Sequence, residues 1–209
     1  MKLLLVGASG LVGSHVLRRA LADERISAVV APTRRALPDH PKLDAPVIDF
    51  DNLSADAPWW QADAVICALG TTMKQAGSRE AFRRVDHDYP LAIASFARQQ
   101  GTPTYVLNSA VGADANSRFF YNRVKGELEQ KLGACGFASL TLVRPGLISG
   151  PRPEFRAGER TAECFLKLFG ALLPRRLRVN PADNIAQALL EEAIEAKPGV
   201  NIVRSAALV

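Results

Sequence analysis

Short apolar runs and segments with apolar residues at helical spacing alternate along this chain of 209 residues. Continuous apolar runs between turn residues predict strands that are buried on both faces, and helical spacing predicts amphipathic helices. We therefore expect strands at 2–6, 26–31, 46–50, 62–69, 104–108, 139–143 and 201–204. We expect a helix after the first strand and others at 79–100, 117–132 and 183–196, with a helical turn at 56–60, a polar loop at 70–78 and an amphipathic segment at 161–173.

Strands that alternate with helices in this way are typical of an α/β fold, a doubly wound parallel sheet with helices on both faces. No internal repeat or linker interrupts the sequence, so we expect a single domain over residues 1–209. The alternation weakens late in the chain, and we expect residues 147–180 to form a small substrate-side lobe over the carboxyl edge of the sheet. Pro90 is expected to kink or locally open the long helix at 79–100.

The first strand ends in a glycine turn, Gly7-x-x-Gly10-x-x-Gly13. Gly7 permits a tight turn, Gly10 lets the backbone approach a pyrophosphate, and Gly13 lets the helix pack close to the strand. The N–H groups at the start of that helix then offer an anion site. Strand, turn and helix together predict dinucleotide binding by Gly7, Ser9, Gly10, Leu11, Val12 and Gly13, against the alternative of a merely structural turn.

Basic residues follow the second strand, where a site that prefers NAD usually has an acid. Thr33, Arg34 and Arg35 occupy this position, and guanidinium groups match the geometry of a 2′-phosphate. The cofactor expected is therefore NADP, as NADPH, unless the arginines are simply solvated. Asp49 and Phe50, after the third strand, are placed to meet the adenine, although Phe50 could equally belong to the core.

Tyr121 and Lys125 lie four residues apart on a predicted helix, so they share one face, and Ser109 ends the fifth strand. A nearby ammonium lowers the pKa of a phenol, and a serine hydroxyl can hold a carbonyl in line. Tyr121 could then transfer a proton while a nicotinamide carries the hydride. A Tyr-x-x-x-Lys pair alone is usually a helix-surface pair; its place after the fifth strand of this pattern gives it weight.

Together these motifs resemble the short-chain dehydrogenase/reductase superfamily, and more closely its atypical Tat-interacting oxidoreductase-like branch. The closer likeness is carried by residues 69–72, 82, 85–86, 88–89, 108–109, 112–114, 121, 125–127, 144–146, 158–159 and 169–170. The resemblance covers almost the whole chain and implies a Rossmann domain that binds NADPH. It implies catalytic roles for Ser109, Tyr121 and Lys125, with Lys125 also bonding the nicotinamide ribose. It further implies cofactor contacts from Ala68, Leu69, Gly70, Thr71, Asn108, Arg144, Pro145 and Gly146.

Two departures from the wider superfamily stand out. The helical asparagine of ordinary members has no clear counterpart, and Asp86 or His87 lies in that region. The substrate lobe is much shorter than in nucleotide-sugar epimerases.

The resemblance implies an NADPH-dependent oxidoreductase that reduces a small carbonyl compound. The alternative is an NADPH-binding regulator with little turnover that acts through a protein partner.

Composition limits the partners and the setting. The net charge of +5 and pI of about 9.4 raise nucleic acid as a partner, but the arginines are scattered and no RNA-binding motif accompanies them, so we expect none. Arg152, Arg156 and Arg160 favour an anionic small molecule instead. No apolar stretch is long enough for a membrane span or signal peptide, which predicts a cytoplasmic protein away from membranes. The oligomeric state stays open between monomer and homodimer: the helices at 79–100 and 117–132 could form a dimer face, but packing on the sheet already accounts for their apolar stripes. Cys67, Cys135 and Cys164 lack metal-ligand spacing, so we expect free thiols and no metal.

Overall fold

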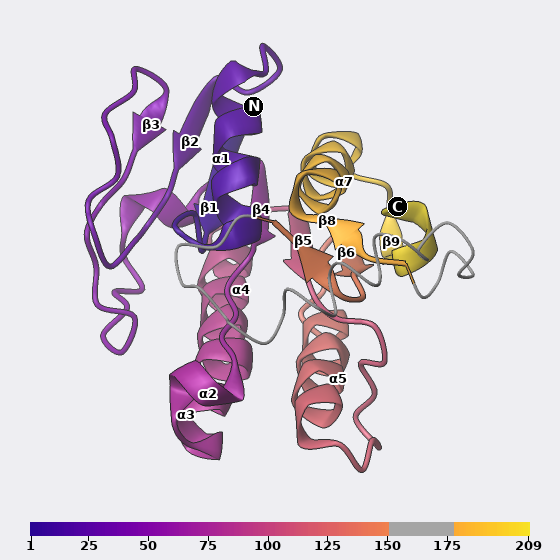
Figure 1. Ribbon diagram of the computed structural model, residues 1–209. Coiled ribbons are helices and arrows are strands. Elements are labelled where there is room, and N and C mark those ends of the chain that lie inside the picture. Colours follow the sequence, from indigo (N-terminus) through magenta and orange to yellow (C-terminus); the bar gives the residue numbers. More distant parts are fainter. Residues whose placement is uncertain (151–177) are drawn as a thin grey trace.

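A seven-stranded parallel sheet forms the centre of the protein, described here by a computed structural model for residues 1–150 and 178–209 (Figure 1). Its order is β3-β2-β1-β4-β5-β6-β9. The strands are β1 (Lys2–Val6), β2 (Ala28–Val30), β3 (Leu43–Asp44), β4 (Ala64–Cys67), β5 (Thr104–Asn108), β6 (Ser139–Arg144) and β9 (Gly199–Arg204). The order reverses between β1 and β4, which is where ligands bind in open sheets of this type. The doubly wound parallel sheet predicted from the sequence is confirmed.

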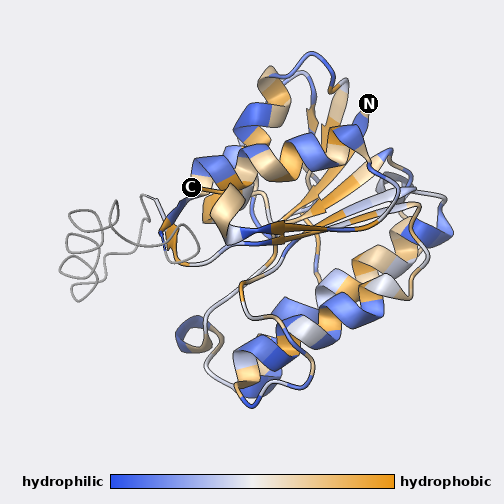
Figure 2. Ribbon diagram, turned by 90° about the vertical axis from the view of Figure 1, so that its right-hand side faces the viewer, coloured by the Kyte–Doolittle hydropathy of each residue, from blue (hydrophilic) through white to orange (hydrophobic). Residues whose placement is uncertain are grey.

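Helices cover both faces of this sheet (Figure 2). On one face, α1 (Leu11–Ala22) and α7 (Ala182–Glu195) pack against Leu3 and Leu5 of β1. On the other, α4 (Tyr89–Gln99) and α5 (Phe120–Gly133) pack against Leu4 and Val6. Alternate side chains of a strand point to opposite faces, so a run that is apolar throughout fits a strand covered on both sides.

The third strand lies earlier than the predicted 46–50. The paired residues are Leu43–Asp44, and beyond them only an isolated bridge joins Thr33 to Val47. Backbone bonds still run on, from Thr33 N–H to the Pro46 carbonyl at 3.0 Å and from Ile48 N–H to the Thr33 carbonyl at 2.8 Å. Pro46 has no N–H to donate across to β2, so the regular ladder stops there.

The long helix predicted at 79–100 is divided into three pieces. α3 (Arg79–Arg83) leads into η2 (Arg84–Asp88), a turn of π-helix, and then into α4. The local opening expected from Pro90 is confirmed, since this residue cannot donate the α-helical bond to the turn before it. The predicted polar loop at 70–78 contains a short helix, α2 (Met73–Ala76), whose first turn is capped by Thr72.

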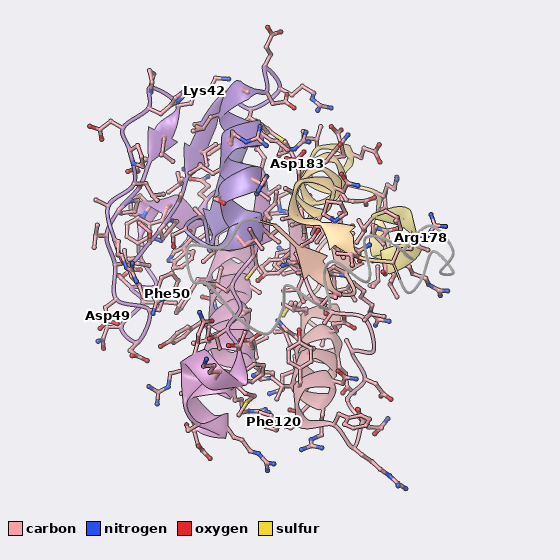
Figure 3. The ribbon with its side chains drawn as sticks, in the orientation of Figure 1. Lys42, Asp49, Phe50, Phe120, Arg178 and Asp183 are labelled. Carbon is pink, nitrogen blue, oxygen red and sulfur yellow. The ribbon has the colours of Figure 1, made fainter. Side chains whose placement is uncertain are left out.

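The end of the chain returns to the sheet through α7 and β9. A last turn, η5 (Ser205–Ala207), follows β9. Earlier in the chain, before β4, the helical turn predicted at 56–60 is η1 (Pro58–Trp60). β7 (Ile148–Ser149) pairs in parallel with β8 (Asn180–Pro181), just before α7. Asp183 accepts hydrogen bonds from Arg18 and Arg19 of α1, which joins α7 to α1 (Figure 3).

Most of the predicted substrate lobe at 147–180 lies outside the described residues. The same holds for the segment at 161–173, for Cys164 and for the arginines at 152, 156 and 160. Within the two described stretches, no helix combines the length and the apolar character needed to cross a bilayer.

Candidate active site

The glycine turn is wedged between the end of β4 and the start of α1. Gly7 has a φ of +90°, and a Cβ there would lie 2.7 Å from the carbonyl carbon of Ala68. A Cβ on Gly13 would lie 2.0 Å from the carbonyl oxygen of Gly7. Both positions therefore exclude any side chain, as expected where a helix and two strand ends meet closely.

The amino end of α1 has no side-chain cap within the part of the chain that the structure describes. Gly10 is the N-cap residue, and the first turn of the helix contains no acid. Ser9 and Gly10 are exposed, and the Gly10 N–H is bonded to the Gly7 carbonyl at 3.0 Å. At the end of β5, the buried Oδ1 atom of Asn108 has no hydrogen-bond partner among the described residues. Free backbone donors and an unpaired amide oxygen fit a dinucleotide that is bound along this edge.

Beyond β2, the main chain is fixed and the charged side chains are free. Thr33 is buried, and its hydroxyl accepts the Arg35 N–H at 3.4 Å. Arg34 and Arg35 are exposed, and across residues 1–150 and 178–209 neither guanidinium has a hydrogen-bond or ion-pair partner. They are available to a phosphate.

Asp49 and Phe50 lie side by side in the loop after β3 (Figure 3). The Asp49 carboxylate accepts the Asp51 N–H at 2.9 Å and the Asn52 side-chain amide at 2.6 Å, which lowers the pKa of Asp49. Phe50 is buried and packs on Tyr89, with ring centroids 5.6 Å apart. Both side chains therefore have partners in the protein, and Phe50 belongs to the core.

Tyr121 and Lys125 lie on consecutive turns of α5, as the spacing predicts. The Tyr121 ring packs on Phe82 of α3 with centroids 5.7 Å apart, and 40% of the residue is exposed. Lys125 is buried, and its Nζ lies 2.8 Å from Oδ1 of Asp86. The second oxygen of Asp86 accepts the Thr71 N–H at 2.7 Å. The predicted cofactor loop after β4 is thus tied to α5 through Asp86.

The pKa of Tyr121 lies above its ordinary value, so the net shift is opposite to the one predicted from Lys125 alone. Burial of the phenol is the main cause, and Asp86 adds to it, while Lys125 acts in the opposite direction but only partly offsets them. Burial also disfavours the Lys125 ammonium, yet Asp86 and Tyr121 outweigh this and raise the pKa of Lys125. The lysine is therefore held as a cation at neutral pH.

Ser109 contacts a residue that the sequence did not single out. Its hydroxyl donates to Glu129 at 2.5 Å, and Glu129 also accepts two hydrogen bonds from the Arg144 guanidinium. Ser109 and Glu129 are 5% and 6% exposed. The structure therefore brings Tyr121 and Lys125 together but gives the Ser109 hydroxyl a different partner.

Two further residues thus belong to the site, Asp86 and Glu129. A signal for Glu129 was present, because it follows Lys125 by four residues, as Lys125 follows Tyr121, and so lies on the same helical face. No local spacing links Asp86 to Lys125, and only the packing of η2 on α5 joins them.

The stretch at 144–146 is held by neighbouring loops. Arg144 pairs with Glu129, the Pro145 carbonyl accepts the Val111 N–H at 2.8 Å, and the Gly146 N–H donates to Asn180 at 2.7 Å. A pocket of about 410 Å³ borders Arg144 and Glu129. The other predicted cofactor loop, 68–71, is held at both ends. The Ala68 N–H donates to the Val6 carbonyl, and the Thr71 N–H donates to the Asp86 carboxylate. Ala68 lies against Gly7 of the glycine turn.

A family model described as NAD(P)H-binding matches residues 7–160, most of the chain. The chain belongs to this NAD(P)H-binding family. The match spans the glycine turn, the loop after β4 and the Tyr121–Lys125 pair, so the coarse cofactor class predicted from the sequence is confirmed.

Named relatives of this NAD(P)H-binding protein support the resemblance predicted from its motifs. Protein HTATIP2 of Rattus norvegicus is 38% identical over 173 residues, which are 80% of this chain and 70% of that protein. The mitochondrial protein fmp52 of Emericella nidulans is 38% identical over 178 residues, which are 79% of this chain and 75% of that protein. The fmp52 protein of Aspergillus niger is 35% identical over 207 residues, which are 93% of this chain and 88% of that protein.

Solved structures of the same fold include nucleotide-sugar enzymes and an oxidoreductase. MoeE5 in complex with UDP-glucose and NAD superimposes with a TM-score of 0.73 at 18% identity, over 97% of this chain and 75% of that one. The oxidoreductase ylbE of Lactococcus lactis gives 0.68 at 16% identity, over 96% and 89%. At these identities the likeness establishes the Rossmann fold.

The predicted cytoplasmic location is wrong. Three of the fungal relatives are named as mitochondrial proteins. The prediction rested on a missing apolar leader, a feature that cannot separate the cytosol from the mitochondrion.

Cysteines and metal ligands add nothing to this site. Cys67 is buried, which raises the pKa of its thiol, and both Cys67 and Cys135 are free. In the parts of the chain that the structure describes, no group of three or more His, Cys, Asp or Glu could hold a metal ion.

Proposed function

We propose that this protein is an NADPH-dependent oxidoreductase that reduces the carbonyl group of a small molecule, with Tyr121 as the proton donor. The observation that carries this proposal is the buried Lys125–Asp86 pair beside Tyr121, on the edge of the sheet where the glycine turn lies. A buried, fully paired cation next to a partly exposed tyrosine is the arrangement expected of a proton-transfer site.

The residues of the chain divide the work of binding and reaction. The glycine turn and the amino end of α1 would hold the pyrophosphate, and Arg34 and Arg35 the 2′-phosphate. When bound, the reduced nicotinamide supplies a hydride to the carbonyl carbon. Tyr121 gives its phenolic proton to the carbonyl oxygen, so the product is an alcohol, and the ammonium of Lys125 stabilises the phenolate until solvent returns the proton.

A second candidate function is an NADPH-binding regulator with little turnover. The observation that favours it is the hydrogen bond from Ser109 to Glu129, because the serine that should polarise a carbonyl already has a buried partner. In the oxidoreductase, Ser109 would instead support α5, and Tyr121 would act without it.

Replacement of Tyr121 separates the two functions. In Tyr121→Phe we expect NADPH oxidation with a panel of aldehydes and ketones to fall about 100-fold or more, because the proton donor is lost. The affinity for NADPH, followed by its fluorescence, should stay within about twofold. Tyr89→Phe is the matched control, since Tyr89 bonds Asp51 at 2.7 Å and takes no part in the proposed proton transfer. If the wild-type protein binds NADPH tightly but none of the carbonyl compounds in the panel leads to NADPH oxidation, the result favours the regulator.

Replacement of both arginines after β2 tests the choice of cofactor. We expect Arg34→Ala/Arg35→Ala to weaken NADPH binding on the order of 100-fold, because charge-assisted hydrogen bonds to the 2′-phosphate are lost. NADH binding should change little, since NADH has no such phosphate. Arg98→Ala, which removes an exposed guanidinium bonded to the Gly136 carbonyl, is the control. Equal losses for both cofactors would contradict the assignment.

A further inference from the structure

Asp86 is a buried acid between the cofactor loop and the catalytic helix. Its Oδ1 lies 2.8 Å from Lys125 Nζ, and the exposed side-chain fractions are 1% for Asp86 and 4% for Lys125. A buried ion pair is retained only where its geometry and further hydrogen bonds offset the loss of hydration. The Thr71 N–H supplies such a bond to the other carboxylate oxygen at 2.7 Å. Asp86 therefore fixes the position of Lys125 relative to the loop after β4.

The same carboxylate changes the electrostatics at Tyr121. The Tyr121 ring contacts Phe82, which precedes Asp86 by one helical turn. A lone ammonium at Lys125 would stabilise the phenolate of Tyr121, but a carboxylate in contact with that ammonium offsets its charge. Asp86 thus opposes the loss of the tyrosine proton.

Few other titratable groups of the described residues face this pair. Lys125 meets Asp86 from η2, Tyr121 from its own helix and Cys67 from β4. Burial raises the pKa of the Cys67 thiol, so this group is neutral at physiological pH. The next residue along η2, His87, is paired with Asp88 at 2.7 Å. Among residues 1–150 and 178–209, the charge balance at Tyr121 is therefore set by Lys125 and Asp86.

We propose that Asp86 is a positioning residue that anchors the Lys125 ammonium to the cofactor loop and keeps the proton on Tyr121. The inference rests on the proposed function and gives it a direction. A tyrosine that holds its proton at neutral pH donates it to a carbonyl oxygen, so the site favours reduction over oxidation of an alcohol. The raised pKa of Tyr121 agrees with this role.

The ionisation of Tyr121 can be measured without cofactor or substrate. The chain has three tyrosines. Burial and the hydrogen bond to Asp51 raise the pKa of Tyr89 to about 12, and burial raises that of Tyr105 well above its ordinary value. The phenolate absorbance step that disappears in Tyr121→Phe therefore reports Tyr121 in a spectrophotometric pH titration.

Removal of Asp86 alone also lowers the pKa of Lys125, so the comparison is made in a Lys125→Met background, where no ammonium titrates beside Tyr121. In Lys125→Met the Thr71 N–H still donates to Asp86. Adding Asp86→Asn should move the Tyr121 step to lower pH by about 1 unit or more, because the carboxylate that opposes the phenolate is removed. This doubly neutral variant leaves no buried charge unpaired and should fold. Asp88→Asn, which neutralises an exposed acid of the same turn, should leave the step in place.

A Tyr121 step that stays in place in the Lys125→Met background when Asp86 becomes Asn would overturn the proposal. This result is independent of the proposed function, which fails instead if the wild-type protein does not bind NADPH. The titration needs no NADPH, so the two failures are distinguishable.

Discussion

Gly13→Ala should lower the free energy of unfolding by about 3 kcal/mol and weaken NADPH binding at least about tenfold. The added Cβ would lie 2.0 Å from the Gly7 carbonyl oxygen and 2.7 Å from the Gly7 carbonyl carbon, so it meets backbone that cannot rotate away. Relief requires α1 to move off the turn, which also moves the N–H groups that would hold the pyrophosphate in the proposed function. Chemical denaturation and NADPH fluorescence titration measure the two effects.

Gly133→Ala is the matched control for this change. Gly133 is the last residue of α5, and a Cβ there meets nothing within 4 Å. Alanine has the higher helix propensity, so we expect this variant to be unchanged or more stable by roughly 0.5–1 kcal/mol. If Gly13→Ala proves as stable as Gly133→Ala and binds NADPH normally, the close packing of α1 on the glycine turn is refuted.

Loss of the Glu129 carboxylate should lower the free energy of unfolding by about as much as Gly13→Ala does. In Glu129→Ala, the Arg144 guanidinium loses both of its bonds to Glu129 and the buried Ser109 hydroxyl loses its acceptor. Removal of one partner of a fully buried ion pair costs about 3–5 kcal/mol, but the Arg144 side chain is 29% exposed and water can reach it, so the expected cost here is about 2–3 kcal/mol. We expect a loss of this size in denaturant unfolding, and a smaller loss of about 1 kcal/mol for Ser109→Ala, which removes one neutral donor.

Glu127→Ala is the control on the same helix. Glu127 pairs with Arg83, but both side chains are partly exposed, at 28% and 38%. Partly exposed ion pairs contribute at most about 1 kcal/mol, so this variant should stay close to wild type. Equal stability losses for Glu127→Ala and Glu129→Ala would show that Glu129 does not hold Ser109 and Arg144 as a buried cluster.

Several parts of the fold and site could be predicted because the deciding signals are local. β1 and β5 have the predicted bounds, since an unbroken apolar run between turn residues leaves a parallel buried strand as the best solution. The glycine turn could be predicted equally well, because the spacing of the glycines is visible in the sequence. β3 was misplaced because Leu43–Asp44 pair as an edge strand without being an apolar run, whereas Pro46, inside the predicted run, interrupts the ladder.

The sequence by itself determined the order of strands and helices, the glycine turn after β1 and the shared helical face of Tyr121 and Lys125. These depend on spacing along the chain, which the sequence displays directly. Only the tertiary structure decided which charges meet: Asp86 reaches Lys125 across 39 positions through the packing of η2 on α5, and Glu129 takes the Ser109 hydroxyl. These contacts join side chains on different elements, and buried charges must be paired there to offset their lost hydration. The spacing of residues along the chain does not predict which of these charges meet.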